Sequence, residues 1–392
     1  MNITFVLFYY LPERPTQNYI YQPIIDALLA LRHRVNIITP NPTRGISREE
    51  QKKYRKINYE KHGNLHIYRV NAFTYNPHHF SKFKLLLRYL SVSFRLPRQL
   101  RKINSDVVFT QTNPPIFLSY LVSNYTKRKG IKLVYNVQDI YPDNIFSPHS
   151  LIYKLTNPLQ IKTLERATKV ITISETMKKT LMRKIRDEDK IKVIYNFAIS
   201  DYRSDEQKEV VRRRLGIDKN KFNVIYAGNI GYVQDIDVLL RAAELLNDND
   251  DINFHIIGEG SQAERIKDKI SNLKLLHVFF HPVQPIEDAV YLYHLADVNV
   301  ISILPQVIKT ALPLKVASCL EARKPIVFIG LDEFSVEKWL DKSEIVPIIE
   351  RNFKQLAFSL QEFSTRKKIE LDYDTSLFNK SKNIDDYISV IL

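Results

Sequence analysis

The sequence predicts an α/β protein that contains two doubly wound parallel-sheet domains in tandem. Short apolar runs of strand length alternate with amphipathic helical segments along nearly the whole chain. The alternation occurs twice, on either side of the polar stretch Ser200 to Gln207, which has the composition of a linker. The length of 392 residues exceeds that at which a single core usually stops growing. We therefore expect one domain over residues 1–200 and a second over 201–375.

The first domain is expected to open with a strand at 2–9, a helix around 20–31 and a strand at 35–38. This order implies a parallel sheet with a right-handed crossover. The first loop holds no Gly-x-Gly-x-x-Gly, which excludes a dinucleotide-binding fingerprint there. The polar, basic residues 43–62 are expected to form a loop. Further strands are expected at 65–70, 107–110, 133–137, 170–173 and 191–194, and helices at 80–103, 117–127, 155–168 and 175–185.

The second domain repeats this alternation of strands and helices. Strands are expected at 224–227, 254–257, 278–280, 298–303 and 326–329. Helices are expected at 236–247, from residue 262, at 286–295 and at 314–322. The final stretch, 376–392, is predicted to be a helix that returns to the first domain.

Charge is distributed unevenly between the two halves of the chain. The net charge is +15, but residues 1–200 contain 33 Lys and Arg against 13 Asp and Glu, whereas residues 201–392 contain 25 against 30. A basic first half suggests a polyanionic partner, either nucleic acid or an anionic membrane surface. Because no nucleic-acid-binding module is recognisable, no nucleic-acid partner is expected.

The cellular compartment is suggested by cysteine usage and hydropathy. A single cysteine, Cys319, excludes an intramolecular disulfide and fits a reducing compartment. No apolar run approaches the roughly 18 residues that span a membrane. We therefore expect a cytoplasmic protein.

Residues 80–103 form a basic amphipathic segment. Apolar side chains there are interleaved with cations, a pattern that suits the interface of an anionic membrane. The alternative is a helix that packs on its own domain and exposes a solvated basic side. The candidate membrane contacts are Lys82, Lys84, Arg88 and Arg95.

Two stretches are candidates for chemistry. Val224 to Leu240 has the pattern of a strand, a turn with Gly228 and Gly231, and a helix. Such a turn can leave backbone N–H groups unpaired at a helix N-terminus, where a phosphate binds, or it can be an ordinary βα turn. Asp139 follows the strand 133–137, where open α/β sheets bind ligands, although it could instead cap the next turn.

An ordered set of motifs resembles the GT-B glycosyltransferases, and more narrowly family 4 of that class. The motifs are YNVQDIYPD at 135–143, ISETM at 173–177, YAGNIG at 226–231, IIGEG at 256–260, ADV at 296–298 and PLKVASCLEARKPIV at 313–327. The NVQDIYPD and GNIGYVQ spellings are most similar to enzymes that assemble bacterial capsule, O-antigen or exopolysaccharide repeat units, including N-acetylfucosaminyl transferases.

The resemblance implies a GT-B fold of two Rossmann-like domains that face a central cleft, with the nucleotide-sugar held mainly by the second domain and the acceptor by the first. It also implies retaining transfer without a metal or other cofactor. Lys315 matches the lysine of the family's Pro-x-Lys pattern and is the cation expected to neutralise the leaving diphosphate. Lys315 and Asp139 are the predicted catalytic residues. The predicted donor-binding residues are Gly228, Asn229, Gly231, Gln234, Gly258, Glu259, Gly260, Ser318 and Arg323.

The chain departs from the family pattern at several of these positions. Thr310 and Ser318 stand where many relatives carry two glutamates, and Asn229 and Gln234 stand where many carry the arginine and lysine that bind the diphosphate. Uncharged amides stabilise a phosphate less than charge-assisted contacts do. Arg323 replaces a common glycine and could be a substitute cation or a surface residue.

Two further positions bear on the chemistry. Gln138 replaces a common histidine, which removes one candidate acid–base group. Asp235-Ile236-Asp237 spells Asp-x-Asp, but its place at a helix start favours capping over metal binding, so no metal is expected.

The leading hypothesis is a peripheral membrane glycosyltransferase at the cytoplasmic face. It would move a sugar from a nucleotide donor, a UDP-sugar by preference, to an undecaprenyl-diphosphate-linked acceptor. The alternatives are a catalytically silent GT-B partner subunit and a GT-B sugar-nucleotide epimerase.

Overall fold

A computed structural model of the chain describes residues 1–13, 16–43, 45–73, 82–112, 116–331, 345–348, 351–366 and 371–392. The chain divides into two compact units. Unit 1 consists of Met1–Tyr195 together with Lys380–Leu392, and unit 2 consists of Asn196–Asn379. The division therefore falls five residues before the expected boundary at residue 200.

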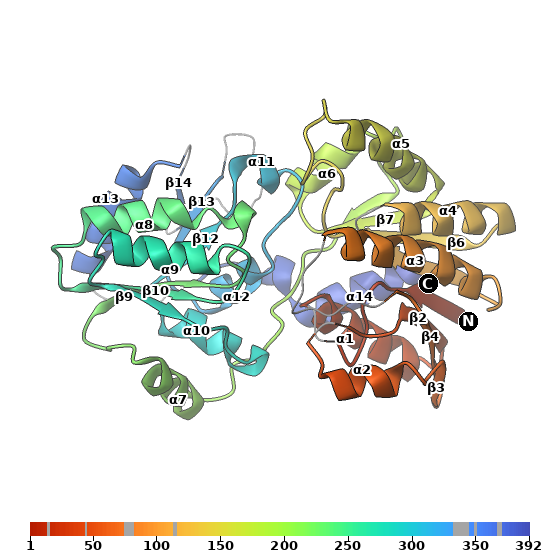
Figure 1. Cartoon of the computed structure of the whole chain (residues 1–392), viewed down its shortest axis with the longest axis horizontal. Coiled ribbons are helices and arrows are strands. Elements are labelled where there is room, and N and C mark those ends of the chain that lie inside the picture. The colour runs from red at the N-terminus through yellow and green to blue at the C-terminus, as the bar shows by residue number, and fades with distance from the viewer. Residues whose placement is uncertain are drawn as a thin grey trace. The chain divides into compact units, whose positions relative to one another are not determined.

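Unit 1 is built on an eight-stranded sheet in the order β3-β4-β2-β1-β5-β6-β7-β8 (Figure 1). All neighbouring strands are parallel except β3 and β4. The strands are β1 (Asn2–Val6), β2 (Arg34–Pro40), β3 (Tyr59–His62), β4 (Leu65–Val70), β5 (Val107–Gln111), β6 (Lys132–Val137), β7 (Lys169–Thr172) and β8 (Ile191–Val193). The direction of chain progression reverses between β1 and β5, so the ligand-binding switch point of this sheet lies there.

Helices pack beside both faces of this sheet. α3, α4 and α5 form one packed layer, and α1 packs with the C-terminal helix α14. The helices are α1 (Thr16–Ala30), α2 (Arg48–Tyr54), α3 (Lys82–Leu100), α4 (Phe117–Lys129), α5 (Leu151–Arg166), α6 (Glu175–Met182) and α14 (Lys380–Ile391). The last helix thus belongs to unit 1 although it follows unit 2 in the chain.

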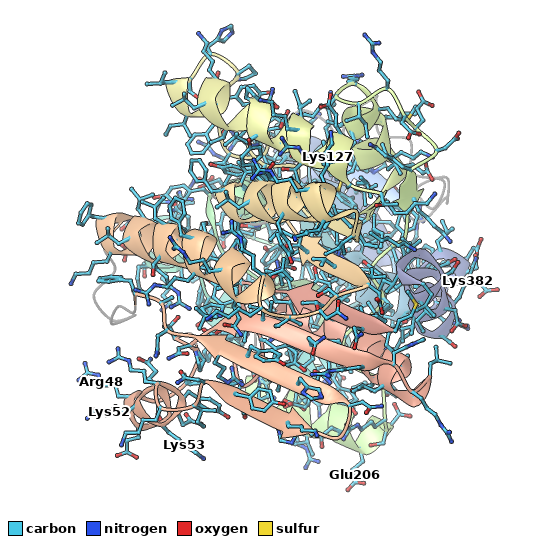
Figure 2. All side chains as sticks on the ribbon, turned by 90° about the vertical axis from the view of Figure 1, so that its right-hand side faces the viewer. Arg48, Lys52, Lys53, Lys127, Glu206 and Lys382 are labelled. Atoms are coloured by element: carbon cyan, nitrogen blue, oxygen red, sulfur yellow. The ribbon has the colours of Figure 1, made fainter. Side chains whose placement is uncertain are left out.

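Residues 43–62 are not the loop that their composition suggested. Ser47 and Glu50 form a capping box that starts α2, and β3 pairs antiparallel with β4. No residue of α2 is buried, and Figure 2 shows Arg48, Lys52 and Lys53 pointing outward from it. The helix therefore has no apolar periodicity to detect, and its N-cap is the only sequence signal.

Unit 2 contains a six-stranded, fully parallel sheet in the order β11-β10-β9-β12-β13-β14. The strands are β9 (Phe222–Ala227), β10 (Ile252–Ile257), β11 (Val278–His281), β12 (Val298–Ser302), β13 (Ile326–Ile329) and β14 (Ile345–Ile348). In the centre, Val224 of β9 lies opposite Phe254 and Val298. All three are buried, and the switch point lies between β9 and β12.

The helices of unit 2 are α7 (Asp205–Leu215), α8 (Ile236–Leu245), α9 (Ala263–Asn272), α10 (Ala289–Leu295), α11 (Pro305–Ile308), α12 (Lys315–Glu321) and α13 (Phe353–Thr365). Part of the predicted linker is helical, because Ser204 caps α7 through the N–H of Gln207. The sequence prediction also missed β14 and α13. No described helix of either unit has the length and hydropathy to span a bilayer.

Candidate functional sites

Two glycine-containing loops meet at the carboxyl edge of the unit 2 sheet. One follows β9 and the other follows β10. Ile230 N–H donates to the Glu259 carbonyl at 2.8 Å, and Gln262 N–H donates to the Ile230 carbonyl at 2.9 Å. A Cβ atom at Gly258 would lie 1.9 Å from the Gly228 carbonyl oxygen. Glycine at 258 is therefore required by the contact between the loops themselves.

The same close approach occurs at Gly260. A Cβ atom there would lie 2.3 Å from the Ile230 carbonyl oxygen, and φ is +154° at both Gly258 and Gly260. Glu259, between the two glycines, is exposed. Glycine at these two positions therefore has a structural cause, whereas the side chain of Glu259 is open to a ligand.

Most backbone amides of the first loop already have protein partners. Gly228 N–H donates to the Ile257 carbonyl at 2.9 Å, Ile230 N–H is used as above, and Gly231 N–H donates to Gln234 Oε1 at 3.1 Å. Of the two interpretations of this turn, the hydrogen bonds therefore favour an ordinary βα turn over one with several unpaired N–H groups. Asn229 N–H is the one amide among residues 228–231 for which the structure shows no hydrogen bond.

The two uncharged residues that replace the family's cations bind each other. Asn229 Nδ2 donates to Gln234 Oε1 at 3.1 Å. A Cβ atom at Gly231 would lie 2.8 Å from both side chains. Asn229 and Gln234 thus brace the turn, which explains why a glycine stands at 231.

Lys315 is the first residue of α12 and reaches the glycine loop. Its Nζ lies 3.6 Å from the centroid of the Tyr226 ring, and a Cβ atom at Gly228 would lie 3.1 Å from this nitrogen. Although the residue is partly exposed, Nζ itself is buried and has no hydrogen-bond partner among the described residues. Burial lowers the pKa of Lys315 to about 7, with the buried Cys319 thiol opposing the shift. An anion at Nζ would restore the charged form.

Tyr226 is a site residue that the sequence analysis did not single out. It is fully buried, its ring lies against Lys315, and its hydroxyl donates to the Asn229 carbonyl at 2.6 Å. One side chain therefore connects the cation to the glycine loop. Its place in the YAGNIG motif, at the end of a strand, was the available signal.

The structure also describes the predicted donor-binding residues Ser318 and Arg323, and Thr310, which stands where many relatives carry a glutamate. Ser318 and Thr310 are each 4% exposed, and Thr310 Oγ1 donates to the Val307 carbonyl at 2.9 Å. Arg323 follows the end of α12, eight residues after Lys315 and therefore about 12 Å farther along the helix direction. Its φ of 54° is left-handed, and its guanidinium lies 3.8 Å from Asp372. Arg323 is a helix-terminating surface residue and not a substitute cation.

The Asp-x-Asp sequence is engaged in ion pairs. Asp235 binds Arg351 at 2.7 and 2.8 Å and makes no side-chain cap, which corrects the capping interpretation. Asp237 binds Arg265 at 2.7 and 3.0 Å and Lys269 at 2.6 Å. The Arg265 hydrogen bonds lower the pKa of Asp237 to about 2, against the opposing effect of burial. Both carboxylates already have cationic partners, which makes them poor metal ligands.

These ion pairs line a cavity of about 220 Å³. Its lining includes Gly231, Gln262 and Leu304 in addition to the two aspartates and two arginines. Sequence reasoning missed Arg265 and Arg351, because neither lies in a recognisable motif.

A second cavity of about 220 Å³ lies at the switch point of unit 1. It is lined by Phe8, Tyr9, Gln17, Tyr89, Thr112, Asp139, Tyr141, Asn144 and Ile145. The Asp139 carboxylate makes no hydrogen bond or ion pair with any described residue. It remains open to water, yet the surrounding protein desolvates it and raises its pKa to about 6. We call this cavity the Asp139 pocket.

Gln138, the residue before Asp139, is hydrogen-bonded to the C-terminal helix. Gln138 Nε2 donates to the Asn136 Oδ1 atom at 3.3 Å and to the Tyr387 hydroxyl of α14 at 3.4 Å. Tyr387 is fully buried. Helix α14 therefore supports the loop that carries Asp139.

The predicted membrane-binding cations of α3 differ in their surroundings. Arg88 is 1% exposed and donates to the carbonyls of Asn41 and Phe73 at 3.1 and 3.2 Å, so it cannot contact a membrane. Lys84 and Arg95 are exposed, and Arg95 donates to the Asn71 carbonyl. The side chain of Lys82 lies outside the described residues. Val92, Leu96 and Leu100 are buried, which shows that α3 also packs on its own domain.

Two family models match the chain. The model described as Glycosyltransferase Family 4 matches residues 20–200, which lie almost wholly in unit 1 and include the Asp139 pocket apart from its β1 and Gln17 side. The model described as Glycosyl transferases group 1 matches residues 207–330, which include both glycine loops and Lys315. The two units are therefore glycosyltransferase domains.

Individual relatives are distant. An uncharacterized glycosyltransferase of Methanocaldococcus jannaschii is 28% identical over 169 residues, 41% of either chain. WcaI of Escherichia coli, whose name assigns it to colanic acid biosynthesis, is 22% identical over 198 residues, 48% of either chain. The chain thus matches less than half the length of these curated relatives. The structure of Anabaena HepE in complex with UDP is similar with a TM-score of 0.69 at 14% identity, covering 99% of each chain. The fold is GT-B.

Proposed function

We propose that this chain, which joins a glycosyltransferase family 4 domain to a glycosyl transferases group 1 domain, transfers a sugar from a nucleotide-sugar to a lipid-diphosphate-linked acceptor. The observation that carries the proposal is the buried Nζ of Lys315 beside the glycine loop, without a partner among the described residues. A buried ammonium is unfavourable unless an anion joins it. The diphosphate of a nucleotide-sugar supplies that anion, and its charge increases as the glycosidic bond breaks.

The donor is a UDP-sugar in this proposal, which the UDP bound to the structurally similar HepE supports. The transferred sugar is an N-acetylated hexose or deoxyhexose, and transfer retains the anomer, both on the family resemblance. Neutralisation of the leaving diphosphate by Lys315 allows the reaction to proceed without a metal.

The acceptor is an undecaprenyl-diphosphate-linked sugar that binds at the Asp139 pocket, in the assembly of capsule, O-antigen or exopolysaccharide. The protein works as a peripheral protein on the cytoplasmic face of the membrane. The basic charge of the first half of the chain supports this location, and the colanic acid assignment of WcaI supports the pathway class.

The test is an assay of the purified chain with UDP- and GDP-sugars and an undecaprenyl-diphosphate-linked sugar, with and without EDTA. We expect an extended glycolipid in both conditions. Failure to transfer or hydrolyse any of the donors would refute the proposal, and loss of activity in EDTA would refute its metal-independent part.

A catalytically silent GT-B subunit is the second candidate. It is favoured by the burial of Thr310 and Ser318 and by the absence of charge at Asn229 and Gln234. Calorimetry with UDP and UDP-sugars discriminates the two, because a silent scaffold need not bind a donor. Incubation with a UDP-N-acetylhexosamine alone, followed by NMR, would reveal an epimerase instead.

A further inference from the structure

Exposed apolar side chains of two helices and one loop lie at the edge of unit 1 on which the Asp139 pocket opens. We define the apolar rim as six residues that are 46% to 71% exposed: Phe83, Leu86, Ile145, Leu151, Ile152 and Leu155. The last four belong to a stretch, 145–155, that the sequence analysis did not connect with a membrane. Exposed large apolar side chains that occur singly are normal, whereas a cluster of them marks an interaction surface.

The topology explains why residues from two helices contribute to one rim. Helices α3 and α5 each lead into the next parallel strand, so both run back from the carboxyl edge of the sheet. Phe83 and Leu86 occupy the first turns of α3, and Leu151, Ile152 and Leu155 occupy the first turns of α5. All of them therefore lie at the edge where the pocket opens, and Tyr89 of α3 and Ile145 line the pocket itself.

The charged residues of the helical layer behind the rim are almost all cationic. Helices α3, α4 and α5 together carry eleven Lys and Arg residues and one acidic residue, Glu165. The basic last turn of α4 includes Lys127, which is labelled in the side view of Figure 2. Among the ten of these cations whose side chains the structure describes, only Arg88 is buried. The layer thus combines apolar groups at one end with positive charge along its length.

We propose that the apolar rim docks on the surface of an anionic phospholipid bilayer. Its apolar side chains enter the headgroup and acyl boundary, while Lys84 and Lys154, in the first turns of α3 and α5, meet lipid phosphates. The inference rests on the proposed function in one respect: docking brings the Asp139 pocket to the level at which the diphosphate of a membrane-embedded acceptor lies.

Charge argues against the other occupants of this surface. A second copy that docked rim to rim would bring two cationic layers together, which is unfavourable. A nucleic acid would use the cations but would leave the aliphatic rim in water, because its recognition relies on phosphate contacts and aromatic stacking. An anionic bilayer satisfies both components at once.

The test compares the variant Leu151→Ser, Ile152→Ser, Leu155→Ser with a matched control in unit 2. The control changes three side chains of unit 2 with similar exposure, Leu245→Ser, Leu276→Ser and Phe358→Ser, which are 54%, 72% and 68% exposed in the parent chain. Sedimentation is measured with phosphatidylcholine vesicles and with vesicles that contain about 30% phosphatidylglycerol. We expect the rim variant to lose ~tenfold or more in partitioning to the anionic vesicles. The control should stay within about twofold of the parent chain.

Equal partitioning of the rim variant and the parent chain would overturn the proposal. Light scattering without lipid measures the oligomeric state of the parent chain and of the rim variant. If the parent chain is a dimer and the rim variant a monomer, the rim binds a second copy and the proposal is wrong. Circular dichroism and thermal melting establish that the variant is folded. Vesicle binding is measured without any nucleotide-sugar. Rim-dependent binding by a protein without transferase activity would therefore refute the proposed function alone, and activity without rim-dependent binding would refute this inference alone.

Discussion

The substitution Lys315→Ala tests the donor site most directly. Nζ is buried beside the glycine loop and has no partner among the described residues, so a bound diphosphate would be its counter-ion. Removal of one preorganised charged donor from a developing anion costs about 3 kcal/mol, or ~100-fold in rate. We expect kcat/KM for transfer to fall by about this factor, measured with a radiolabelled UDP-sugar.

The pH dependence of UDP binding separates this role of Lys315 from a structural one. Because burial lowers the pKa of the free site to about 7, Lys315 is charged below that pH and neutral above it. UDP affinity measured by calorimetry should therefore fall as pH rises through about 7, and Lys315→Ala should abolish this dependence. The control is Arg323→Ala, at the opposite end of α12, which should stay within about threefold. An activity of Lys315→Ala within threefold of the parent chain would show that the reasoning is wrong.

Substitutions at four further positions probe the two sites, and Gly216→Ala serves as a control. Tyr226→Phe keeps the ring but removes the hydroxyl from the Asn229 carbonyl, so we expect a smaller loss of UDP affinity than with Tyr226→Leu, which also removes the ring from Lys315; equal losses would contradict a separate role for the ring. Asp139→Asn should raise the melting temperature at neutral pH but not near pH 4, because the raised pKa of Asp139 means that its ionised form destabilises the fold. If the melting temperatures of Asp139→Asn and the parent chain differ by the same amount at both pH values, this reasoning is wrong. Gly258→Ala places Cβ 1.9 Å from the Gly228 carbonyl oxygen and should cost at least ~2 kcal/mol in unfolding free energy, whereas Gly216→Ala, with φ +64° and open space around it, should cost only about 1 kcal/mol; denaturant melts give both values. Gln234→Lys frees the Gly231 amide and adds a cation, so UDP affinity measured by calorimetry should rise, and by more than in Gln234→Met, which frees the amide without adding charge.

The alternating strands and helices could be predicted from the sequence because most of them are long enough to show apolar periodicity. Two of the missed elements, α2 and β14, lack this signal, whereas α13 carries it in the buried Leu356, Leu360 and Phe363 and was detectable. Helix α2 buries no residue, and β14 has only four residues, far from any motif. The basic segment 80–103 shows a different limit, since periodicity indicates an amphipathic helix but does not tell which cation faces the core. Arg88 does so because the carbonyls of Asn41 and Phe73 lie within its reach.

The candidate site was predictable where a motif carries it and not where distant residues meet. The glycine loops and Lys315 were found through their motifs. The ion pair between Asp235 and Arg351 joins residues 116 positions apart, and no local sequence pattern at either residue predicts it. Arg323 was assigned as a possible cation because its charge is visible in the sequence. Its left-handed φ of 54° is not visible in the sequence, although it accounts for the glycine that is common at this position.

The structure leaves fewer groups besides Lys315 to bind a diphosphate than the motifs alone suggested. A glycine loop at a helix N-terminus ordinarily offers several N–H groups to a phosphate. Here the amides of Gly228, Ile230 and Gly231 donate to the protein, and Asn229 and Gln234 bind each other. Arg265 and Arg351 stand near this loop, but each already binds a carboxylate. Among the described groups at the loop, Lys315 therefore remains the cation without a counter-ion. That cation is desolvated and titrates near neutrality, so donor binding and protonation of Lys315 must be coupled. The affinity of the site for a diphosphate therefore depends on pH.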